Sequence, residues 1–236
     1  MRTAIENRVS RRTFENRPID GKKRQAIIEL INQFNALSGL KMEFIEDGSR
    51  GFQNLKKSYG LFSNVRSIVL MKGEKEDEHL REKIGYYGEA LILDMTDLNL
   101  GTCWVGGTFD KEEFKVVDDE ELVCVIAVGE VVKASLKEKM VRSAARIKSV
   151  KMAERIESDQ PLPAWVEAGM NAVCLAPSAK NTQKAKFKFK DNLLTASIID
   201  DYIFDLVDLG IAKKHFEIEA KGSFDFGNGA AFHPNK

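Results

Sequence analysis

The stretch "CLAPSAKNTQKAKFKFKDN", residues 174–192, changes character three times. The end of an apolar segment runs into the polar turn "APSAKNTQ", and the turn runs into a segment that alternates Lys with Ala or Phe. A residue before proline is pushed out of the α region, so a helix that starts after Pro163 is expected to end near Ala176. The residues expected to face inward from this helix are Ala164, Trp165, Ala168, Ala172 and Leu175.

The alternation after the turn predicts a strand, because successive side chains of a strand point to opposite faces. Ala185, Phe187 and Phe189 are expected to face the core. The side chains expected to face water are Lys184, Lys186, Lys188 and Lys190. The whole stretch therefore predicts a helix, a polar turn and a half-buried strand in direct succession.

Capping signals and hydrophobic periodicity predict the other elements. Asp20 is placed to cap a helix that Gly39 ends, and Gly101 is placed to end a longer helix over 83–99. We also expect strands at 41–47, 64–73 and 121–131, a short helix after Asp110, and a polar helical connector over 133–163. This mixture predicts an α+β fold.

The sequence also repeats itself. "KMEFIED" (41–47) and "KFKFKD" (186–191) share one pattern, and the stripes of two helices match in spacing: Ile84, Gly85, Tyr87, Leu91 and Met95 with Leu209, Gly210, Ala212, Phe216 and Ala220. Such a repeat predicts two related halves, 1–135 and 136–236. The halves are expected to pack as a pseudo-dimer around antiparallel sheet and central helices, together forming one domain, because each half alone would leave an apolar face uncovered.

Composition narrows the class of protein. Lys plus Arg and Asp plus Glu both number 36, and 43% hydrophobic with 31% charged residues is ordinary for a soluble globular chain. We expect a cytoplasmic protein without nucleic-acid or membrane partners, because no charge excess, signal peptide or long apolar run is present. Cys103, Cys124 and Cys174 are far apart and have no ligand-like spacing, which predicts neither disulfides nor a metal site.

Three motifs carry candidate chemistry. In "NRVSRRTF", Arg8, Ser10 and Arg12 alternate, so an extended backbone would point two guanidiniums and a hydroxyl the same way, as a phosphate clamp requires. The alternative is a solvated basic N-terminus.

The second motif is "LGTCWVGG", residues 100–107, whose glycines would let the backbone approach a flat ligand. Its alternative is an ordinary helix stop and loop. The third is the polar turn, whose hydroxyl and amides suit the edge of a heterocycle, although such residues also occur in ordinary turns.

Together the three motifs closely resemble the signatures of the FMN-dependent nitroreductase family, in particular its internally duplicated branch. The resemblance runs from Ile5 to about Ala220, and the polar turn is its most specific part. It implies a nitroreductase-like fold and one FMN per chain, bound by a monomer. The flavin-contacting residues that it implies are Arg8, Ser10, Arg12, Thr102, Cys103, Trp104, Val105, Gly106, Gly107, Pro177, Ser178, Asn181 and Gln183, with Arg146 and Lys148 as further basic phosphate contacts.

The function that the resemblance implies is hydride transfer from NADH or NADPH, through FMN, to a small acceptor such as a nitro compound or quinone, in a ping-pong cycle. No catalytic side chain is expected, because the cofactor carries the redox chemistry, and His79, His215 and His233 are assigned no role. Relatives often continue the turn as Q-P-W, whereas here Lys184 and Ala185 follow Gln183, which leaves the substrate pocket undefined. Two alternatives stay open: a flavin carrier or redox sensor without turnover, and a basic interaction module without flavin.

Overall fold

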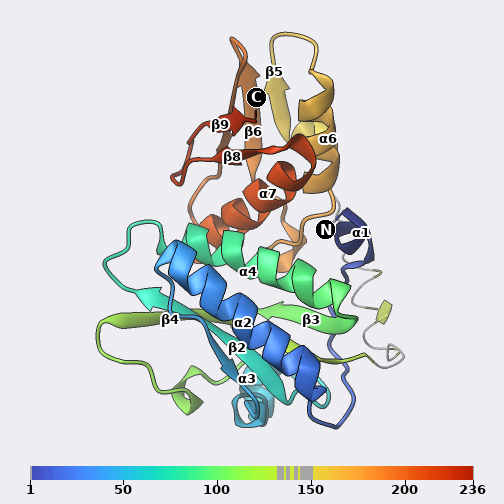
Figure 1. Ribbon diagram of the computed structural model, residues 1–236, viewed down its shortest axis with the longest axis vertical. Coiled ribbons are helices and arrows are strands. Elements are labelled where there is room, and N and C mark those ends of the chain that lie inside the picture. Colours follow the sequence, from blue (N-terminus) through green and yellow to red (C-terminus); the bar gives the residue numbers. More distant parts are fainter. Residues whose placement is uncertain (1, 132–135, 137–138, 141–142, 144–150, 236) are drawn as a thin grey trace. The chain divides into compact units, whose positions relative to one another are not determined.

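The computed structural model of the chain describes residues 2–131, 136, 139–140, 143 and 151–235. Its backbone divides into two units, which we name by their main sheets (Figure 1). The four-stranded unit comprises Asn7–Leu80 and Leu91–Ala144, and the three-stranded unit comprises Met1–Glu6, Arg81–Ala90 and Ala145–Lys236. The sequence-based boundary between residues 135 and 136 stays a prediction.

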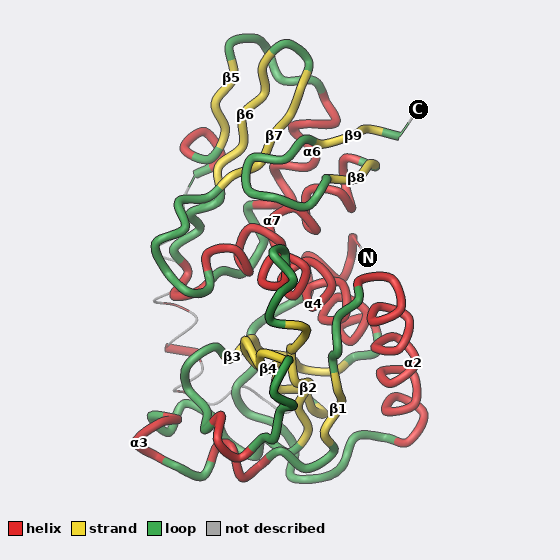
Figure 2. The backbone as a smooth tube through the Cα atoms, turned by 90° about the vertical axis from the view of Figure 1, so that its left-hand side faces the viewer, coloured by secondary structure: helices red, strands yellow, loops and turns green. Residues whose placement is uncertain are grey.

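The sheet of the four-stranded unit is antiparallel and has the order β1-β2-β4-β3. Its strands are β1 (Glu43–Ile45), β2 (Ser67–Glu74), β3 (Leu100–Val105) and β4 (Glu120–Glu130). The residues of β4 are buried from Leu122 to Glu130, which suits a strand with a neighbour on both sides. The strands predicted at 41–47, 64–73 and 121–131 are confirmed as β1, β2 and β4. Figure 2 shows them as neighbours in one sheet.

Helix α2 (Gly21–Ser38) forms as its caps predict. The Asp20 carboxylate accepts the Lys22 amide at 3.0 Å and also accepts the Lys23 amide. Gly39 ends the helix at φ 77°, a conformation that costs glycine little. The side-chain amide of Asn35 then donates to the carbonyl of Met42 and accepts its N–H, at 2.8 and 2.9 Å, which fixes the chain as it enters β1.

The predicted end of the long helix at Gly101 is wrong. Helix α4 spans Leu80–Asp97, and Asn99 makes the turn at φ 57°, so that Gly101 lies inside β3. Asn tolerates this left-handed conformation better than most residues, which is why no glycine is needed there. The shorter helical elements include α1 (Arg2–Asn7), η1 (Ser49–Phe52), α3 (Leu55–Ser58), η2 (Lys111–Glu113), η3 (Met152–Glu154) and η4 (Ala179–Asn181).

The three-stranded unit has the sheet order β5-β6-β7. Strand β5 (Ile156–Ser158) runs parallel to β6 (Lys186–Lys190), which pairs antiparallel with β7 (Leu193–Ser197). Helices α6 (Ala164–Val173) and α7 (Asp205–Ala220) pack on it, and β8 (Gly222–Phe224) pairs with β9 (Phe232–Pro234). Strand β5 lies in the segment predicted to be a helical connector, so that prediction is wrong for 156–158.

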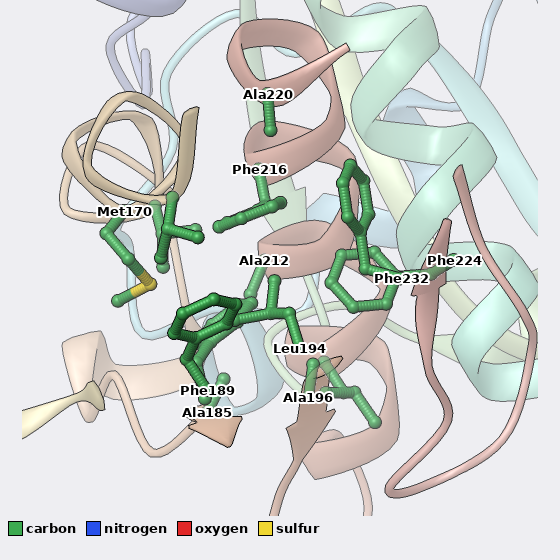
Figure 3. Packing of buried hydrophobic residues seen from close by; sticks show 14 of the residues in the cluster. Met170, Ala185, Phe189, Leu194, Ala196, Ala212, Phe216, Ala220, Phe224 and Phe232 are labelled. Atoms are coloured by element: carbon green, nitrogen blue, oxygen red, sulfur yellow. The ribbon is translucent and has the colours of Figure 1, made fainter. Parts of the chain in front are cut away.

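An apolar core fills this unit between α6, α7 and β6 (Figure 3). Ala185, Phe187 and Phe189 are buried as the alternation predicts, and Phe187 stacks on Phe216. The predicted inner face of α6 is wrong in part: Ala164 is exposed and Leu175 is 47% exposed, whereas Val166 and Met170 are fully buried. The helix ends at Val173, so Leu175 lies beyond the helical periodicity used to place it.

Residues 82–89 of α4 and helix α7 share buried polar contacts within the same unit. The Lys213 ammonium pairs with the Glu82 carboxylate, and burial lowers the pKa of Lys213. His215 lies 3.1 Å from the carbonyl of Ala172 through Nδ1 and 2.9 Å from Glu89 through Nε2. A carbonyl only accepts, so Nδ1 carries a proton and His215 is held as a packed core residue.

No helix in the described part of the chain combines the length and the apolar character that a bilayer crossing needs.

Candidate functional site

The basic N-terminal motif lies along the glycine-bearing strand of the four-stranded unit. Ser10 forms a parallel β-bridge with Thr102, and the Arg11 amide donates to the Thr102 carbonyl at 2.7 Å. The Arg11 side chain covers Gly101: a Cβ at Gly101 would lie 3.0 Å from the Arg11 Cγ. Two motifs that are about ninety residues apart in sequence are therefore neighbours in the fold.

The segment that carries Arg8, Ser10 and Arg12, here called the clamp segment, is also fixed at its C-terminal end. The Ser63 amide donates to the Arg12 carbonyl at 2.8 Å, and the Phe14 amide donates to the Ser63 carbonyl at 3.1 Å. The buried Phe14 ring then packs against Gly101 and Gly129. Arg8, Ser10 and Arg12 are all only partly buried, so their side chains keep contact with solvent on a rigid backbone.

The second motif is a strand for most of its length, which corrects the expected loop over 102–107. Thr102, Cys103 and Val105 are buried in β3, Trp104 is partly buried, and only Gly106 and Gly107 leave the strand. The pairing of β3 with β4 uses the backbone groups of this segment on one side, and the bridge to Ser10 lies on the other. Gly107 has open space around it, since a Cβ there would meet no atom within 4 Å.

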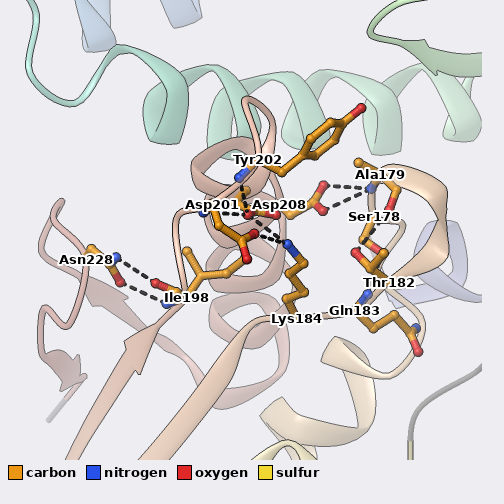
Figure 4. A network of polar contacts seen from close by, with 11 residues as sticks. Ser178, Ala179, Thr182, Gln183, Lys184, Ile198, Asp201, Tyr202, Asp208 and Asn228 are labelled. Atoms are coloured by element: carbon orange, nitrogen blue, oxygen red, sulfur yellow. Dashed lines mark hydrogen bonds and ion pairs between the residues drawn. The ribbon is translucent and has the colours of Figure 1, made fainter.

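The polar turn, residues 176–183, is a tight structure in the three-stranded unit (Figure 4). Lys180, Asn181 and Gln183 have φ of 53°, 54° and 49°, although none is a glycine. The Ser178 hydroxyl accepts the Gln183 amide at 2.9 Å, and the Thr182 hydroxyl donates to the Ala179 carbonyl at 3.1 Å. The Ser178 oxygen therefore holds the turn, and its proton is left to donate elsewhere.

Asp208 of α7 fastens this turn to the helix. Its two carboxylate oxygens lie 2.9 and 3.0 Å from the Ala179 amide nitrogen, and the residue is 4% exposed. Burial raises the pKa of Asp208 to about 7, against the bond from Ala179, which lowers it. A carboxyl group that changes charge near neutral pH thus sits behind the turn.

The expectation that Lys184 faces water, as the other strand lysines do, is wrong, because its side chain is partly buried against two carboxylates. Its ammonium lies 3.0 Å from the buried Asp205 carboxylate and also pairs with Asp201. The same Asp205 oxygen accepts the Tyr202 amide at 2.9 Å, which forms the entry to α7. Lys184 is therefore part of the support of the turn, whereas Lys186, Lys188 and Lys190 are exposed.

Arg155 holds the end of α6, just before the turn begins. It is 2% exposed, and its Nη1 donates to the carbonyl of Val173, at the end of α6, at 2.8 Å. A cation at a helix C-terminus complements the helix dipole. Burial lowers the pKa of Arg155 and raises that of the adjacent Cys174, so the arginine is held in a poorly solvated position.

The structure places Pro177, Ser178, Asn181 and Gln183 together in the three-stranded unit, and Arg8, Ser10, Arg12 and the 102–107 segment together in the four-stranded unit. Arg146 and Lys148 lie outside the described residues. Sequence reasoning missed Asp208, Arg155 and the role of Lys184. The signal for Asp208 was the pair of acids, Asp205 and Asp208, in the first turn of α7, which is also what a helix dipole favours.

Two further observations bear on the kind of site. Within the residues that the structure describes, no cluster of three or more His, Cys, Asp or Glu side chains is arranged to hold a metal ion. An open hollow in the four-stranded unit includes none of the candidate residues and has acidic and basic groups on its rim. Its lining comprises Glu43, Ile45, Asp47, Gly48, Ser49, Arg50, Gln53, Leu70, Glu113, Phe114 and Lys115.

A family model and a solved structure that match nearly the whole chain are both described as nitroreductases. A family model described as "Putative TM nitroreductase" matches residues 1–220. A Thermotoga maritima structure, described as a "putative nitroreductase", is similar at TM-score 0.65 and 23% identity, over 98% of this chain and 90% of that one. The search of curated proteins returned no match.

Two more solved structures align with part of the chain. An FMN-dependent nitroreductase from Clostridium difficile R20291 has a TM-score of 0.48 and 17% identity, over 57% of this chain and 90% of that one. A nitroreductase with bound FMN from Bacteroides fragilis has a TM-score of 0.45 and 15% identity, over 57% of this chain and 89% of that one.

Proposed function

Because the chain belongs to the TM nitroreductase family, we propose that it is an FMN-dependent oxidoreductase that uses NADH or NADPH to reduce a small acceptor, such as a nitro compound or a quinone. The proposed cycle is ping-pong: the reductant leaves before the acceptor binds. The flavin assignment rests on the three motifs, which resemble those of FMN-dependent nitroreductases. The reductant and the acceptor rest on that resemblance alone.

The observation that carries the proposal is the docking of the basic segment on β3. Ser10 bridges Thr102, so a segment with a hydroxyl between two guanidiniums lies beside the glycine-bearing strand. The donor set suits a phosphate monoester, because the two arginines offer paired N–H donors and the hydroxyl adds an O–H donor. A solvated basic tail would not need its backbone bonded to Thr102 and Ser63.

We assign Arg8, Ser10 and Arg12 to the phosphate of FMN, and Gly106 and Gly107 to close approach of backbone to the ring. Pro177, Ser178, Asn181 and Gln183 are assigned to the ring edge or the ribityl chain, as the motif resemblance implies. Their chemistry suits this role, because the turn offers a hydroxyl and two amides without adding a charge. That both sets serve one flavin is a prediction from the sequence.

When bound, FMN would accept the hydride and pass the electrons on, so the chain itself needs to bind, orient and shield. Arg8 and Arg12 would neutralise the phosphate, and the amides of the turn would read the edge of the ring. Two of the described histidines have other partners: His215 contacts Glu89 and the Ala172 carbonyl, and His233 pairs with Asp225 at the surface.

An anaerobic titration tests the proposed function. The purified full-length chain is loaded with FMN, freed of excess ligand, and examined for protein-bound flavin absorbance. Reductant is then added without oxygen, followed by a nitroaromatic or a quinone. We expect one flavin per chain, bleaching by NADH or NADPH, and return of the oxidised spectrum when the acceptor is added.

The alternatives give different results in the same experiment. Binding without bleaching by either nucleotide would favour a flavin carrier or sensor. Bleaching without reoxidation by any nitro compound or quinone would contradict the proposed class of acceptor. Absence of flavin binding would contradict the proposed function as a whole and would favour a basic interaction module.

A further inference from the structure

We propose that Asp208 is a positioning residue that holds the polar turn in its flavin-binding shape and makes flavin affinity respond to pH. The inference rests on the proposed function, since it concerns the same cofactor. It assigns a role to a residue that lies behind the turn and that belongs to none of the three motifs.

Geometry carries the first step. Both oxygens of the Asp208 carboxylate are within 3.0 Å of one backbone N–H, that of Ala179, which opens η4 (Figure 4). Ala179 lies between Ser178 and Asn181, two of the residues assigned to the ring edge or ribityl chain. Because Asp208 is fixed in the first turn of α7, this bond sets the position of the turn relative to the helix.

Backbone strain shows why the turn needs an anchor. Lys180, Asn181 and Gln183 each occupy the left-handed region, which is unfavourable for Lys and Gln and less so for Asn. Such conformations persist where the surroundings over-determine them, and they cluster at ligand sites. The bonds that hold this turn include that of the Ser178 hydroxyl with the Gln183 amide, within the turn, and that of Asp208 with the Ala179 amide, which ties the turn to α7.

Asp208 holds the C-terminal end of the segment 173–179, and a buried cation holds its N-terminal end. Arg155 donates to the carbonyl of Val173, six residues before the amide that Asp208 accepts. A carbonyl is bound by a positive group and an N–H by a negative group, so each bond matches the backbone dipole at its end. The segment 173–179 is therefore fixed at both ends by fully or nearly buried charges.

The charges around Asp208 make the anchor sensitive to protons. Burial raises the pKa of Asp208 to about 7, the nearby Asp205 adds to the rise, and Lys184 and Arg155 oppose it together with the Ala179 amide. The ionised carboxylate accepts the amide more strongly than the neutral acid does, because charge-assisted hydrogen bonds are stronger. A ligand that needs the anchored turn should therefore bind more tightly as pH rises through 7.

The test compares FMN affinity of the full chain with that of Asp208→Asn between pH 6 and pH 8.5, by quenching of flavin fluorescence. The phosphate of FMN also titrates, with a second pKa near 6, but it does so equally in both proteins. We expect equal affinities at pH 6 and wild-type binding about five- to tenfold tighter at pH 8, the difference between a charged and a neutral hydrogen bond. The exposed Asp200→Asn is the matched control and should follow the wild type.

The ratio of the two affinities separates this role from a merely structural one. A ratio that stays constant with pH would overturn the proposal even if Asp208→Asn binds FMN weakly at every pH. If Asp208→Asn does not fold, as judged by circular dichroism, Ala179→Pro removes the amide instead. Proline is tolerated at the first position of a helical turn.

Ala179→Pro should lose affinity at pH 8 and little at pH 6, and an unchanged pH profile would again overturn the proposal. Failure of the wild type to bind FMN at any pH would contradict the proposed function, and this inference with it. The two failures are thus distinguishable by the wild-type titration alone.

Discussion

Gly85 of α4 and Gly210 of α7 make reciprocal contacts in the three-stranded unit. A Cβ on Gly85 would lie 2.0 Å from the carbonyl oxygen of Val207, and a Cβ on Gly210 would lie 2.0 Å from that of Glu82. Each carbonyl belongs to the residue three positions before the partner glycine. Exchange of equivalent contacts is what a twofold relation produces, so this crossing supports the prediction that α4 and α7 are equivalent helices of two related halves.

Gly85→Ala and Gly210→Ala are both expected to destabilise the fold. The added methyl group would collide with backbone, so the two helices would have to move apart, at a cost of about 1 to 3 kcal/mol or more in the free energy of unfolding. The two losses should be similar because the contacts are reciprocal. Urea unfolding followed by circular dichroism measures them.

Gly21→Ala provides the control, because Gly21 opens α2 and a Cβ there would meet no atom within 4 Å. It should leave the free energy of unfolding unchanged or raise it slightly. Unaltered stability of Gly85→Ala and Gly210→Ala would mean that the helices do not cross at these glycines.

The sequence predicted the α+β, nitroreductase-like fold, and the family match over residues 1–220 and the shared fold with the Thermotoga maritima structure confirm it. Local signals were sufficient where one residue decides the outcome: Asp20 and Gly39 end α2 as expected. They failed at Gly101, because glycine marks both helix stops and close backbone approach, and only the packing of Arg11 on β3 distinguishes the two.

The clamp arginines are expected to dominate FMN affinity. Arg8→Ala and Arg12→Ala each remove a charged partner of the phosphate, which costs on the order of 1.5 to 3 kcal/mol, or about ten- to 150-fold in Kd. Isothermal titration or flavin fluorescence measures the affinity. If either arginine instead belongs to a solvated tail, its substitution will change Kd by less than a factor of two or three.

Two exposed residues serve as matched controls for the clamp. Arg24→Ala removes an arginine whose partner is the exposed Glu46, and Lys188→Ala removes a lysine from the water-facing side of β6. Both should leave Kd nearly unchanged. Lys184 is unsuitable because it pairs with the buried Asp205, so its loss would disturb the support of the polar turn. Equal losses in all four variants would contradict the clamp.

The candidate site shows what sequence patterns do not contain. The polar turn was identified from its hydroxyl and amides, but its left-handed residues and its anchor on Asp208 depend on a helix that follows some thirty residues later. Arg155 falls in the predicted polar helical connector because its neighbours are polar, whereas its side chain is buried and only 2% exposed. Burial of a single charge depends on tertiary contacts, and composition does not report them.

Asp208 should also make stability depend on pH. Its pKa rises from 3.8 in the unfolded chain to about 7 in the fold, so between these values the folded state holds more protons than the unfolded state. Stability from this group therefore falls as pH rises from 4 to 7 and levels off above 7. Asp208→Asn does not titrate, so its free energy of unfolding relative to wild type should increase over that range, by on the order of 2 to 4 kcal/mol.

Urea unfolding at pH 4.5, 6 and 8 checks this difference, and Asp200→Asn is again the control. A difference between Asp208→Asn and wild type that is the same at all three pH values would show that Asp208 does not titrate abnormally. If the free energy of unfolding of Asp208→Asn fell relative to wild type as pH rises, the pKa of Asp208 would be shifted the opposite way, and the folded state would favour the ionised form.

Loss of the Lys213 charge alone is expected to lower the free energy of unfolding more than loss of both charges of its ion pair with Glu82. The side chains of Lys213 and Glu82 are 1% and 3% exposed, and the ammonium also donates to the carbonyls of Asp225 and Gly227 at 3.0 and 2.9 Å. Glu82 also accepts the Gly227 amide at 2.7 Å. Both members of the pair therefore bind the loop between β8 and β9. Lys213→Met leaves a buried carboxylate without its cation, which typically costs about 3 to 5 kcal/mol.

The double variant Glu82→Gln with Lys213→Met removes both charges and keeps an amide that can still accept from Gly227. Its free energy of unfolding should therefore exceed that of Lys213→Met alone, because the uncompensated charge is gone. Urea unfolding gives the three values, and limited proteolysis near residues 225–229 shows whether the loop is released. Lys190→Met, on the exposed side of β6, should behave as wild type. A double variant that is less stable than Lys213→Met would mean that the pair contributes through its hydrogen bonds to the loop rather than through charge compensation.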